Sequence, residues 1–231
     1  MNFELAVRLT EVIMGLAFAQ QSLEHIRVAV NGRLLFIARF VLAILLVIGL
    51  QSSLIIVLLL FIGFAMLHRF DGPYNGGADR MSLLILSCLA CVHLAPDLYW
   101  KEIAFAYLAA QLMLSYFISG WVKLINAEWR NGRALCDVFE FSAYPVSESL
   151  RGLAASPRVL FVMSWIVILF ELLFPLSIMS EATLLVALIL AGGFHFANAF
   201  LFGLNRFFWI WIAAYPSILW FQQRIFDTIS V

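Results

Sequence analysis

The chain has 231 residues, of which 64% are hydrophobic and only 12% are charged. This composition excludes an ordinary soluble domain and is typical of a polytopic membrane protein. The 14 basic and 14 acidic residues give a formal net charge of zero, so the overall charge does not favour nucleic acid as a partner. We therefore expect an all-α transmembrane helical bundle, a single integral membrane domain over residues 1–231, with the lipid bilayer as its main partner.

Apolar runs near the roughly 20 residues needed to cross a bilayer recur along the chain. They predict seven spans, at about 35–50, 53–68, 80–95, 102–125, 158–178, 182–203 and 206–222. Only "LQSS" joins the first two, so one long kinked helix is an alternative, although about 34 residues is too long for one crossing. The amphipathic segment 4–23 predicts an eighth span or an interfacial helix, giving 7–8 membrane segments.

Basic residues are unevenly distributed between alternate loops if the eighth span is assumed. One side receives little beyond Lys101 and Arg224. By the positive-inside rule the other side is cytoplasmic, and we expect a multi-pass protein of a bacterial inner (cytoplasmic) membrane. The residues on that side are Arg27, Arg33, Arg39, Arg69, Arg80, Arg130, Arg133, Arg151, Arg158 and Arg206.

A long connection at 126–157 lies on the Arg-rich side. Loops of that length in a compact protein are usually functional or disordered. Apolar positions at Leu135, Val138 and Phe139 argue against full disorder. They predict an interfacial or re-entrant helix, followed by a turn at Tyr144–Pro145.

A second long connection, at 68–80, contains Asp71 and Asp79. Their spacing does not match an EF-hand loop, and turn chemistry explains the neighbouring glycines and asparagine. Three histidines, His25, His68 and His93, are scattered over different segments and form no recognisable set of metal ligands. We therefore predict no metal site.

Three ionisable residues inside the predicted spans are candidate catalytic groups: Lys123, Glu171 and His195. Charged groups at such depth are costly and usually face a bundle interior or a wet cavity. Gln111, Ser115, Ser119 and Lys123 recur every four residues, so they form one slowly drifting stripe on a helix. This stripe predicts a polar track that leads to the lysine and that contributes to a substrate site.

Two interpretations of Lys123 remain open. In the first, the lysine snorkels to the interface at a helix end, while Trp121 and Trp129 join the aromatic belt. In the second, apolar surroundings weaken the hold of the amine on its proton, so that it acts as a base or nucleophile. Pairing with Glu128 would oppose the second interpretation.

Glu171 and His195 have their own local signals. Pro175 leaves the carbonyl of residue 171 without its helical donor, which predicts a kink or a wet pocket. His195, near Asn198, is either a packing residue or a catalytic or ligand-binding one. Depths counted at about 1.5 Å per residue place Lys123 near the Arg-rich face and Glu171 toward the other side, which favours a cavity shared by Lys123 and His195.

Four segments together resemble the HTTM membrane domain family, whose best-known member is the vitamin K-dependent gamma-glutamyl carboxylase. They are "DGPYNGGADRMSLLIL", "QLMLSYFISGWVKLINAEWRNGRAL", "FELLFPL" and "FHFANAFLFGLNRFFW". The most specific part is the series Tyr116, Gly120, Lys123, Leu124, Trp129 and Gly132. The resemblance covers roughly residues 5 to 222, and Glu171, Pro175 and His195 also resemble family positions.

The resemblance implies a role for Lys123 as the base that triggers hydroquinone oxygenation, with a quinone or hydroquinone as the associated small molecule. Two departures bear on the activity. The stretch "YNGGADR" lacks a histidine that the carboxylase carries there, and the chain ends without the large extramembrane region that engages the carboxylase's peptide substrate.

Three functions are consistent with these observations. The first is an enzyme in which Lys123 is the base, His195 assists and Glu171 orients, with a possible coupling to modification of a small peptide. Its candidate substrate-binding residues are Gln111, Ser115, Ser119, Tyr116, Asn198 and Trp129. The second is a non-enzymatic subunit that anchors or assembles a larger complex of membrane-protein partners. A small-molecule carrier that uses the break near Pro175 is the third.

Overall fold

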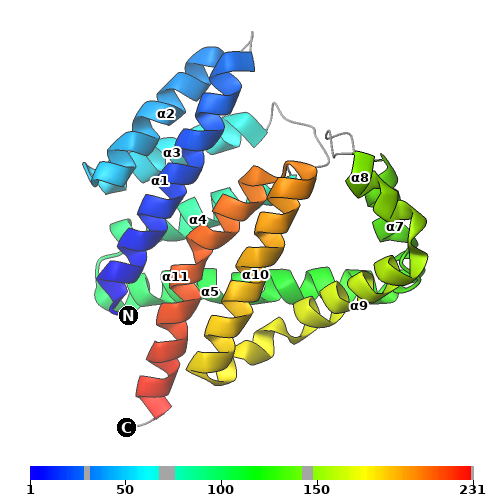
Figure 1. Ribbon diagram of the computed structural model, residues 1–231. Coiled ribbons are helices and arrows are strands. Elements are labelled where there is room, and N and C mark those ends of the chain that lie inside the picture. The colour runs from blue at the N-terminus through cyan, green and yellow to red at the C-terminus, as the bar shows by residue number, and fades with distance from the viewer. Residues whose placement is uncertain (29–31, 68–75, 142–147, 230–231) are drawn as a thin grey trace. The chain divides into compact units, whose positions relative to one another are not determined.

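The computed structural model describes residues 1–28, 32–67, 76–141 and 148–229, and its regular elements there are all helical. This confirms the all-α prediction (Figure 1). The predicted turn at Tyr144–Pro145, and Asp71, lie outside the described residues. The elements are α1 (Phe3–Val28), α2 (Arg33–Ile48), α3 (Ser52–Leu67), α4 (Gly76–Leu94), α5 (Leu98–Ile125), α6 (Ala127–Arg130), α7 (Arg133–Phe141), α8 (Glu148–Arg151), η1 (Gly152–Ala155), α9 (Pro157–Leu173), η2 (Phe174–Met179), α10 (Glu181–Phe202) and α11 (Asn205–Ile229).

Four helical segments of the described chain are long and apolar enough to cross a membrane: Gly77–Leu94, Leu98–Ile125, Pro157–Met179 and Glu181–Phe202. The chain therefore has the helices of an integral membrane protein. The larger count of seven or eight is not established, because neither α1 nor α11 is among these four, and α2 and α3 have only 16 residues each. At 1.5 Å per residue they extend about 24 Å, which is less than the roughly 30 Å of a hydrocarbon core.

The chain reverses between α2 and α3, so the alternative of one long kinked helix is wrong. Gly49 ends α2 in the left-handed region with φ 86°, and its N–H donates to the carbonyls of Leu45 and Leu46. Gln51 follows with φ 49°. This non-glycine residue in a sparsely populated region marks a tight turn immediately before the first residue of α3.

The chain divides into two compact units, and the first comprises Met1–Ala110 and Arg206–Val231. In this unit α1 packs against α2, α2 against α3, and α3 against α4. An aromatic cluster joins α1, α5 and α11, because the Phe3 ring centroid lies 5.7 Å from that of Phe105 and 5.2 Å from that of Trp220. Edge-to-face packing of these rings stabilises the contact between the three helices.

The second unit comprises Gln111–Asn205, and it contains the end of α5 and the elements from α6 to α10. Here the predicted helix in the 126–157 connection is confirmed as α7. Phe139 of α7 is 1% exposed, and its ring packs edge-on against Phe202 at 5.2 Å. The proposal of a single integral membrane domain is not tested by this division into compact units.

Two local sequence signals determine how α9 passes into α10. The helix α9 ends at Leu173, and the 3₁₀ segment η2 carries Pro175 at its start. This change of helix type is the break that the missing proline N–H predicts. The next helix begins with a capping box, in which Ser180 accepts from the N–H of Thr183 and the Thr183 hydroxyl accepts from the N–H of Ser180.

Candidate functional site

Lys123 and Glu171 form a direct pair in the second unit. The Nζ of Lys123 lies 2.6 Å from the Oε2 of Glu171 and 2.6 Å from the Oγ of Ser119. The side chains of the pair are 15% and 5% exposed, respectively. Trp129 flanks the amine, with its ring centroid 5.2 Å from Nζ, within the range of a cation–π contact. A charged or proton-sharing pair is thus held almost completely away from solvent.

The pair depends on a very close approach of α5 to α9. A Cβ added at Gly120 would lie 2.7 Å from the backbone nitrogen of Leu172 and 3.0 Å from the Cβ of Glu171. Any larger residue would therefore push the two helices apart. The glycine lies one turn before Lys123, so it sets the distance across which the lysine reaches the carboxylate.

The segment after α5 continues alongside α9 in the opposite direction. The Ser164 Oγ donates to the carbonyl of Trp129, and the Trp165 Nε1 donates to the carbonyl of Arg130 at 3.0 Å. Gly132 has φ 80°, and a Cβ there would lie 2.8 Å from the nitrogen of Phe161. Six residues separate Lys123 from Trp129 and seven separate Ser164 from Glu171, so the two stretches match in length.

This register corrects the depth argument made from the sequence. That argument placed Glu171 too far from Lys123 and favoured a cavity shared by Lys123 and His195. It assumed that the end of α5 lies level with the start of α9. The structure instead extends the chain past Lys123 through α6, so that α9 has already advanced by about four turns when it reaches the lysine. Glu128, which was considered as the pairing acid, is exposed.

A second polar pair lies on the same face of α5. The Tyr116 OH and the His195 Nε2 are 2.8 Å apart, and both side chains are buried. The Tyr116 ring stacks on Phe174 with a centroid distance of 4.0 Å. Tyr116 precedes Lys123 by seven residues, which is two helical turns or about 10 Å. His195 therefore belongs to a neighbouring pair and makes its contact with the tyrosine.

The other predicted substrate-binding residues are distributed along these helices. Ser115 donates its hydroxyl proton to the carbonyl of Gln111 at 2.7 Å, and both residues are partly buried on the α5 stripe. Asn198 is partly buried on α10, where its backbone carbonyl accepts from the N–H groups of Gly203 and Leu204. Ser119 and Trp129 thus contact the lysine, whereas Gln111, Ser115 and Asn198 lie farther along α5 and α10.

The first unit contains buried charges that sequence reasoning did not single out. Glu11 is 3% exposed and contacts both Arg8 and His93. Arg39 is 4% exposed, with its guanidinium carbon 3.9 Å above the centroid of the Phe18 ring. The sequence did show these residues as ionisable groups inside apolar segments. Their partners could not be predicted, because Glu11 and His93 are 82 residues apart and no local spacing relates them.

Asp79, the described one of the two acidic residues in the 68–80 connection, forms an ion pair. Asp79 accepts from the Arg206 guanidinium, and each side chain is 15% exposed. This contact joins the start of α4 to the start of α11 within the first unit. Asp79 is therefore a charge partner for a buried arginine.

The Lys123 pair has the components of a proton-transfer site. It combines one amine, one carboxylate, a serine hydroxyl on the amine and an indole face, all largely withdrawn from water. Protons move readily between groups at hydrogen-bond distance, and low local polarity strengthens their interaction. The Tyr116–His195 pair is a separate hydrogen-bonded contact, about two helical turns from the lysine along α5.

Comparisons with known proteins assign a family to this part of the chain. The model of the HTTM domain matches residues 98–223, more than half of the 231 residues. The matched range includes Tyr116, Lys123, Glu171 and His195. A search of curated proteins and a search of solved structures each returned no match.

Proposed function

Because the chain belongs to the HTTM domain family, we propose that it is a membrane-embedded enzyme in which Lys123 acts as the base on a hydroquinone or a similarly acidic lipid-soluble substrate. The observation that carries the proposal is the 2.6 Å contact between the Lys123 Nζ and the Glu171 Oε2. The pair lies in an integral membrane protein, where a lipid-soluble substrate reaches it from the bilayer.

The pair supplies a base without a large rearrangement. A lysine and a carboxylate that share a short hydrogen bond can interconvert between an ion pair and a neutral amine with a neutral acid by moving only the proton. In the neutral form the Nζ lone pair accepts the phenolic proton of the substrate. Glu171 keeps the proton it received from the lysine, and its carbonyl oxygen and the Ser119 hydroxyl oxygen then accept hydrogen bonds from the ammonium that forms, beside the substrate phenolate.

Aromatic side chains around the pair suit a planar substrate. Trp129 lies over Nζ at 5.2 Å, and Phe170, next to Glu171 in sequence, packs edge-on against Tyr116 at 6.2 Å. Ring stacking and edge contacts of this kind stabilise an aromatic ligand. His195 assists through the Tyr116 hydroxyl, and Gln111, Ser115 and Asn198 supply polar groups along α5 and α10.

The proposal also covers the steps after proton removal and the membrane in which they take place. Addition of dioxygen to the hydroquinone anion generates a stronger base, which then removes a proton from a small peptide, in the manner that the family resemblance implies. The bacterial inner membrane is the proposed location. Each of these extensions requires the Lys123 chemistry, so the lysine is tested first.

The test is hydroquinone-dependent oxygen uptake by the purified protein in lipid nanodiscs. Lys123→Ala should abolish the uptake, and Lys123→Arg should do the same, because it keeps the charge but supplies no neutral amine. Lys101→Ala is the matched control on the same helix and should retain wild-type uptake. Equal uptake by wild type and Lys123→Ala would remove the lysine from the mechanism.

A second function, a non-enzymatic subunit of a membrane complex, is supported by one surface. An apolar stripe on α9 recurs every three or four residues and is about half exposed, as expected for a helix that packs against a partner or lipid. Stoichiometric partner proteins that co-purify from the native membrane, without a quinone or peptide, would favour this function. The stripe consists of Val159, Val162, Ile166, Leu169 and Leu173.

A further inference from the structure

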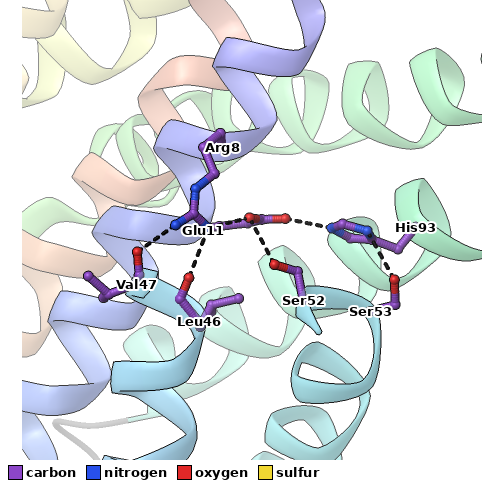
Figure 2. Close-up of polar contacts among 7 residues, drawn as sticks. All are labelled: Arg8, Glu11, Leu46, Val47, Ser52, Ser53 and His93. Atoms are coloured by element: carbon purple, nitrogen blue, oxygen red, sulfur yellow. Dashed lines mark hydrogen bonds and ion pairs between the residues drawn. The ribbon is translucent and has the colours of Figure 1, made fainter. Parts of the chain in front are cut away.

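A network of hydrogen bonds in the first unit brings a serine, a histidine and a buried glutamate into line (Figure 2). The Ser53 Oγ lies 3.3 Å from the His93 Nδ1, and the His93 Nε2 lies 2.5 Å from the Glu11 Oε1. The three residues come from α3, α4 and α1, respectively. All three precede the range that the family model matches, so the family assignment does not account for them.

The two oxygens of Glu11 have different partners. Oε2 accepts from the Arg8 Nη1 at 2.8 Å and from the Ser52 Oγ at 3.4 Å, whereas Oε1 faces His93. Arg8 also donates to the carbonyls of Leu46 and Val47 at the end of α2. One oxygen therefore anchors the carboxylate to the helices, and the other is left to orient the imidazole.

The contact with Glu11 determines which nitrogen of His93 carries the proton. A carboxylate accepts hydrogen bonds, so it selects the tautomer that is protonated at Nε2. The Nδ1 atom then carries a lone pair that faces the Ser53 hydroxyl. Burial raises the pKa of the Glu11 carboxyl, but the hydrogen bonds from His93 and Arg8 outweigh this and hold the pKa below its ordinary value. The carboxylate form is therefore favoured near neutral pH.

Ser53 is placed where a substrate can reach it. It is exposed and is the second residue of α3, directly after the turn at Gln51 with its φ of 49°. The N–H groups of a helix's first turn have no acceptor within the helix, so they are suited to stabilise an oxyanion beside the serine. A strained turn that presents a serine next to a base is a recurrent arrangement at nucleophiles.

The surroundings of Ser53 indicate an apolar substrate. Large apolar side chains are at least half exposed at two connections and the helix ends next to them, between α2 and α3 and between α4 and α5, and the Ser53–His93 contact joins these regions. In a protein with membrane-crossing helices, such a surface faces the acyl region of the bilayer or its interface. These residues are Leu50, Leu54, Leu94, Leu98, Tyr99 and Trp100.

From this geometry we propose that Ser53, His93 and Glu11 form a second active site, a serine-nucleophile centre that hydrolyses or transfers the acyl group of a lipid carboxylic ester. The Ser53 Oγ attacks the ester carbonyl carbon while its proton passes to the His93 Nδ1. The bond from this carbon to the leaving alcohol oxygen breaks, and His93 returns the proton to that oxygen. Water, or an acceptor alcohol, then attacks the acyl-serine with the same proton exchange and restores Ser53.

The test is covalent labelling by a fluorophosphonate probe, applied to the full-length protein in lipid nanodiscs and located by peptide mass spectrometry. The wild type should be labelled at Ser53, and Ser53→Ala should not be labelled. Ser87→Ala is the matched control, because it removes a hydroxyl of the same unit, on α4, that lies outside this network, and it should be labelled like the wild type. Labelling that persists in Ser53→Ala, or absent labelling of the folded wild type, would overturn the proposal.

The role of the base is tested separately. His93→Gln keeps a hydrogen-bonding side chain but supplies no base, so the labelling rate of the folded protein should fall by about 100-fold or more. An unchanged rate would exclude His93 as the base. Oxygen uptake from a hydroquinone does not require Ser53, so the outcome is independent of the function proposed for Lys123.

Glu11 acts through His93 and is therefore a positioning residue. Glu11→Ala should lower the labelling rate per folded molecule, and Glu11→Asp should restore part of it, because a carboxylate again faces the imidazole. If both variants change the thermal midpoint but leave the labelling rate of the folded fraction unchanged, Glu11 is only structural. In that case the three-residue centre is refuted.

Discussion

Among the residues whose burial the structure describes, each of the two units buries one glutamate, and the partners of the two carboxylates differ. Glu171 in the second unit meets a lysine amine on one oxygen, with the Ser119 hydroxyl on the same amine. Glu11 in the first unit is bound on both oxygens, by Arg8, Ser52 and His93. Glu171 contacts the Lys123 amine and the Ser119 hydroxyl, and it can exchange a proton with the amine. Glu11, held by an arginine, a serine and a histidine, stays fixed and orients the imidazole.

The backbone explains part of this difference. Arg8 uses its guanidinium to cap the carbonyls of Leu46 and Val47 at the end of α2, so the Glu11 cluster joins helix ends. The Lys123 pair instead joins side chains in the last turns of α5 and α9, two helices that Gly120 allows to approach closely along their sides. Loss of a partner should therefore have different consequences in the two units.

The largest effect is expected from removing one member of the Lys123 pair. Glu171→Leu leaves an amine buried without its counterion, which should lower the free energy of unfolding by about 3 to 5 kcal/mol. The double variant Lys123→Met with Glu171→Leu should recover most of this loss, because no buried charge remains. Denaturant titration in mixed micelles measures both. A double variant as unstable as the single one would show that the pair contributes mainly through packing.

Arg8→Met should have the next largest effect and tests the other unit. It removes two carbonyl contacts at the end of α2 and one donor to Glu11. Hydrogen bonds to charged groups are worth about 1.5 to 3 kcal/mol, and the same titration should show a loss in this range. The control is Arg80→Met, an exposed arginine on α4, which should leave the unfolding curve unchanged. Equal curves for the two variants would refute the capping role of Arg8.

Sequence periodicity predicted the elements of both units better than it predicted their contacts. The helical stripe of Gln111, Ser115, Ser119 and Lys123 lies on α5 as predicted. The helix type changes at Pro175, where α9 passes into η2, whereas the kink or wet pocket expected there stays a prediction. These features depend on residues close in sequence. Burial of Glu171 beside Lys123 depends on the register of two helices that are 48 residues apart, which no local pattern encodes.

The close approach at Gly120 shows where a stronger sequence signal existed. A glycine one turn before a lysine in a predicted span indicates helix contact, but not which helix. The partner helix is α9, and its register against α5 depends on α6. This four-residue helix is too short to be predicted from hydrophobic periodicity. The Glu11 cluster had still less signal, because its histidine looked isolated in the sequence. Predicted helix ends alone therefore misjudged depth along the membrane.

Gly120→Ala should have a moderate effect and tests the helix approach in the second unit. The added Cβ meets backbone atoms of α9 at 2.7 Å, and such overpacking costs about 1 to 3 kcal/mol. It should also lower oxygen uptake, since the lysine moves relative to Glu171. Gly192→Ala is the control, because a Cβ there meets nothing within 4 Å, and it should stabilise α10 by up to about 1 kcal/mol. Destabilisation by both alanines alike would argue against a specific contact at Gly120.

Ser52→Ala should have the smallest effect, and it separates anchoring from catalysis in the first unit. The bond from the Ser52 Oγ to the Glu11 Oε2 is 3.4 Å long, and Arg8 remains on the same oxygen at 2.8 Å. The free energy of unfolding should therefore change by about 0.5 kcal/mol or less. A loss of several times this size would mean that Ser52 has a larger share in the anchoring of Glu11. A small loss of stability in Ser52→Ala, with intact labelling, would support Ser53 as the hydroxyl from which His93 takes the proton.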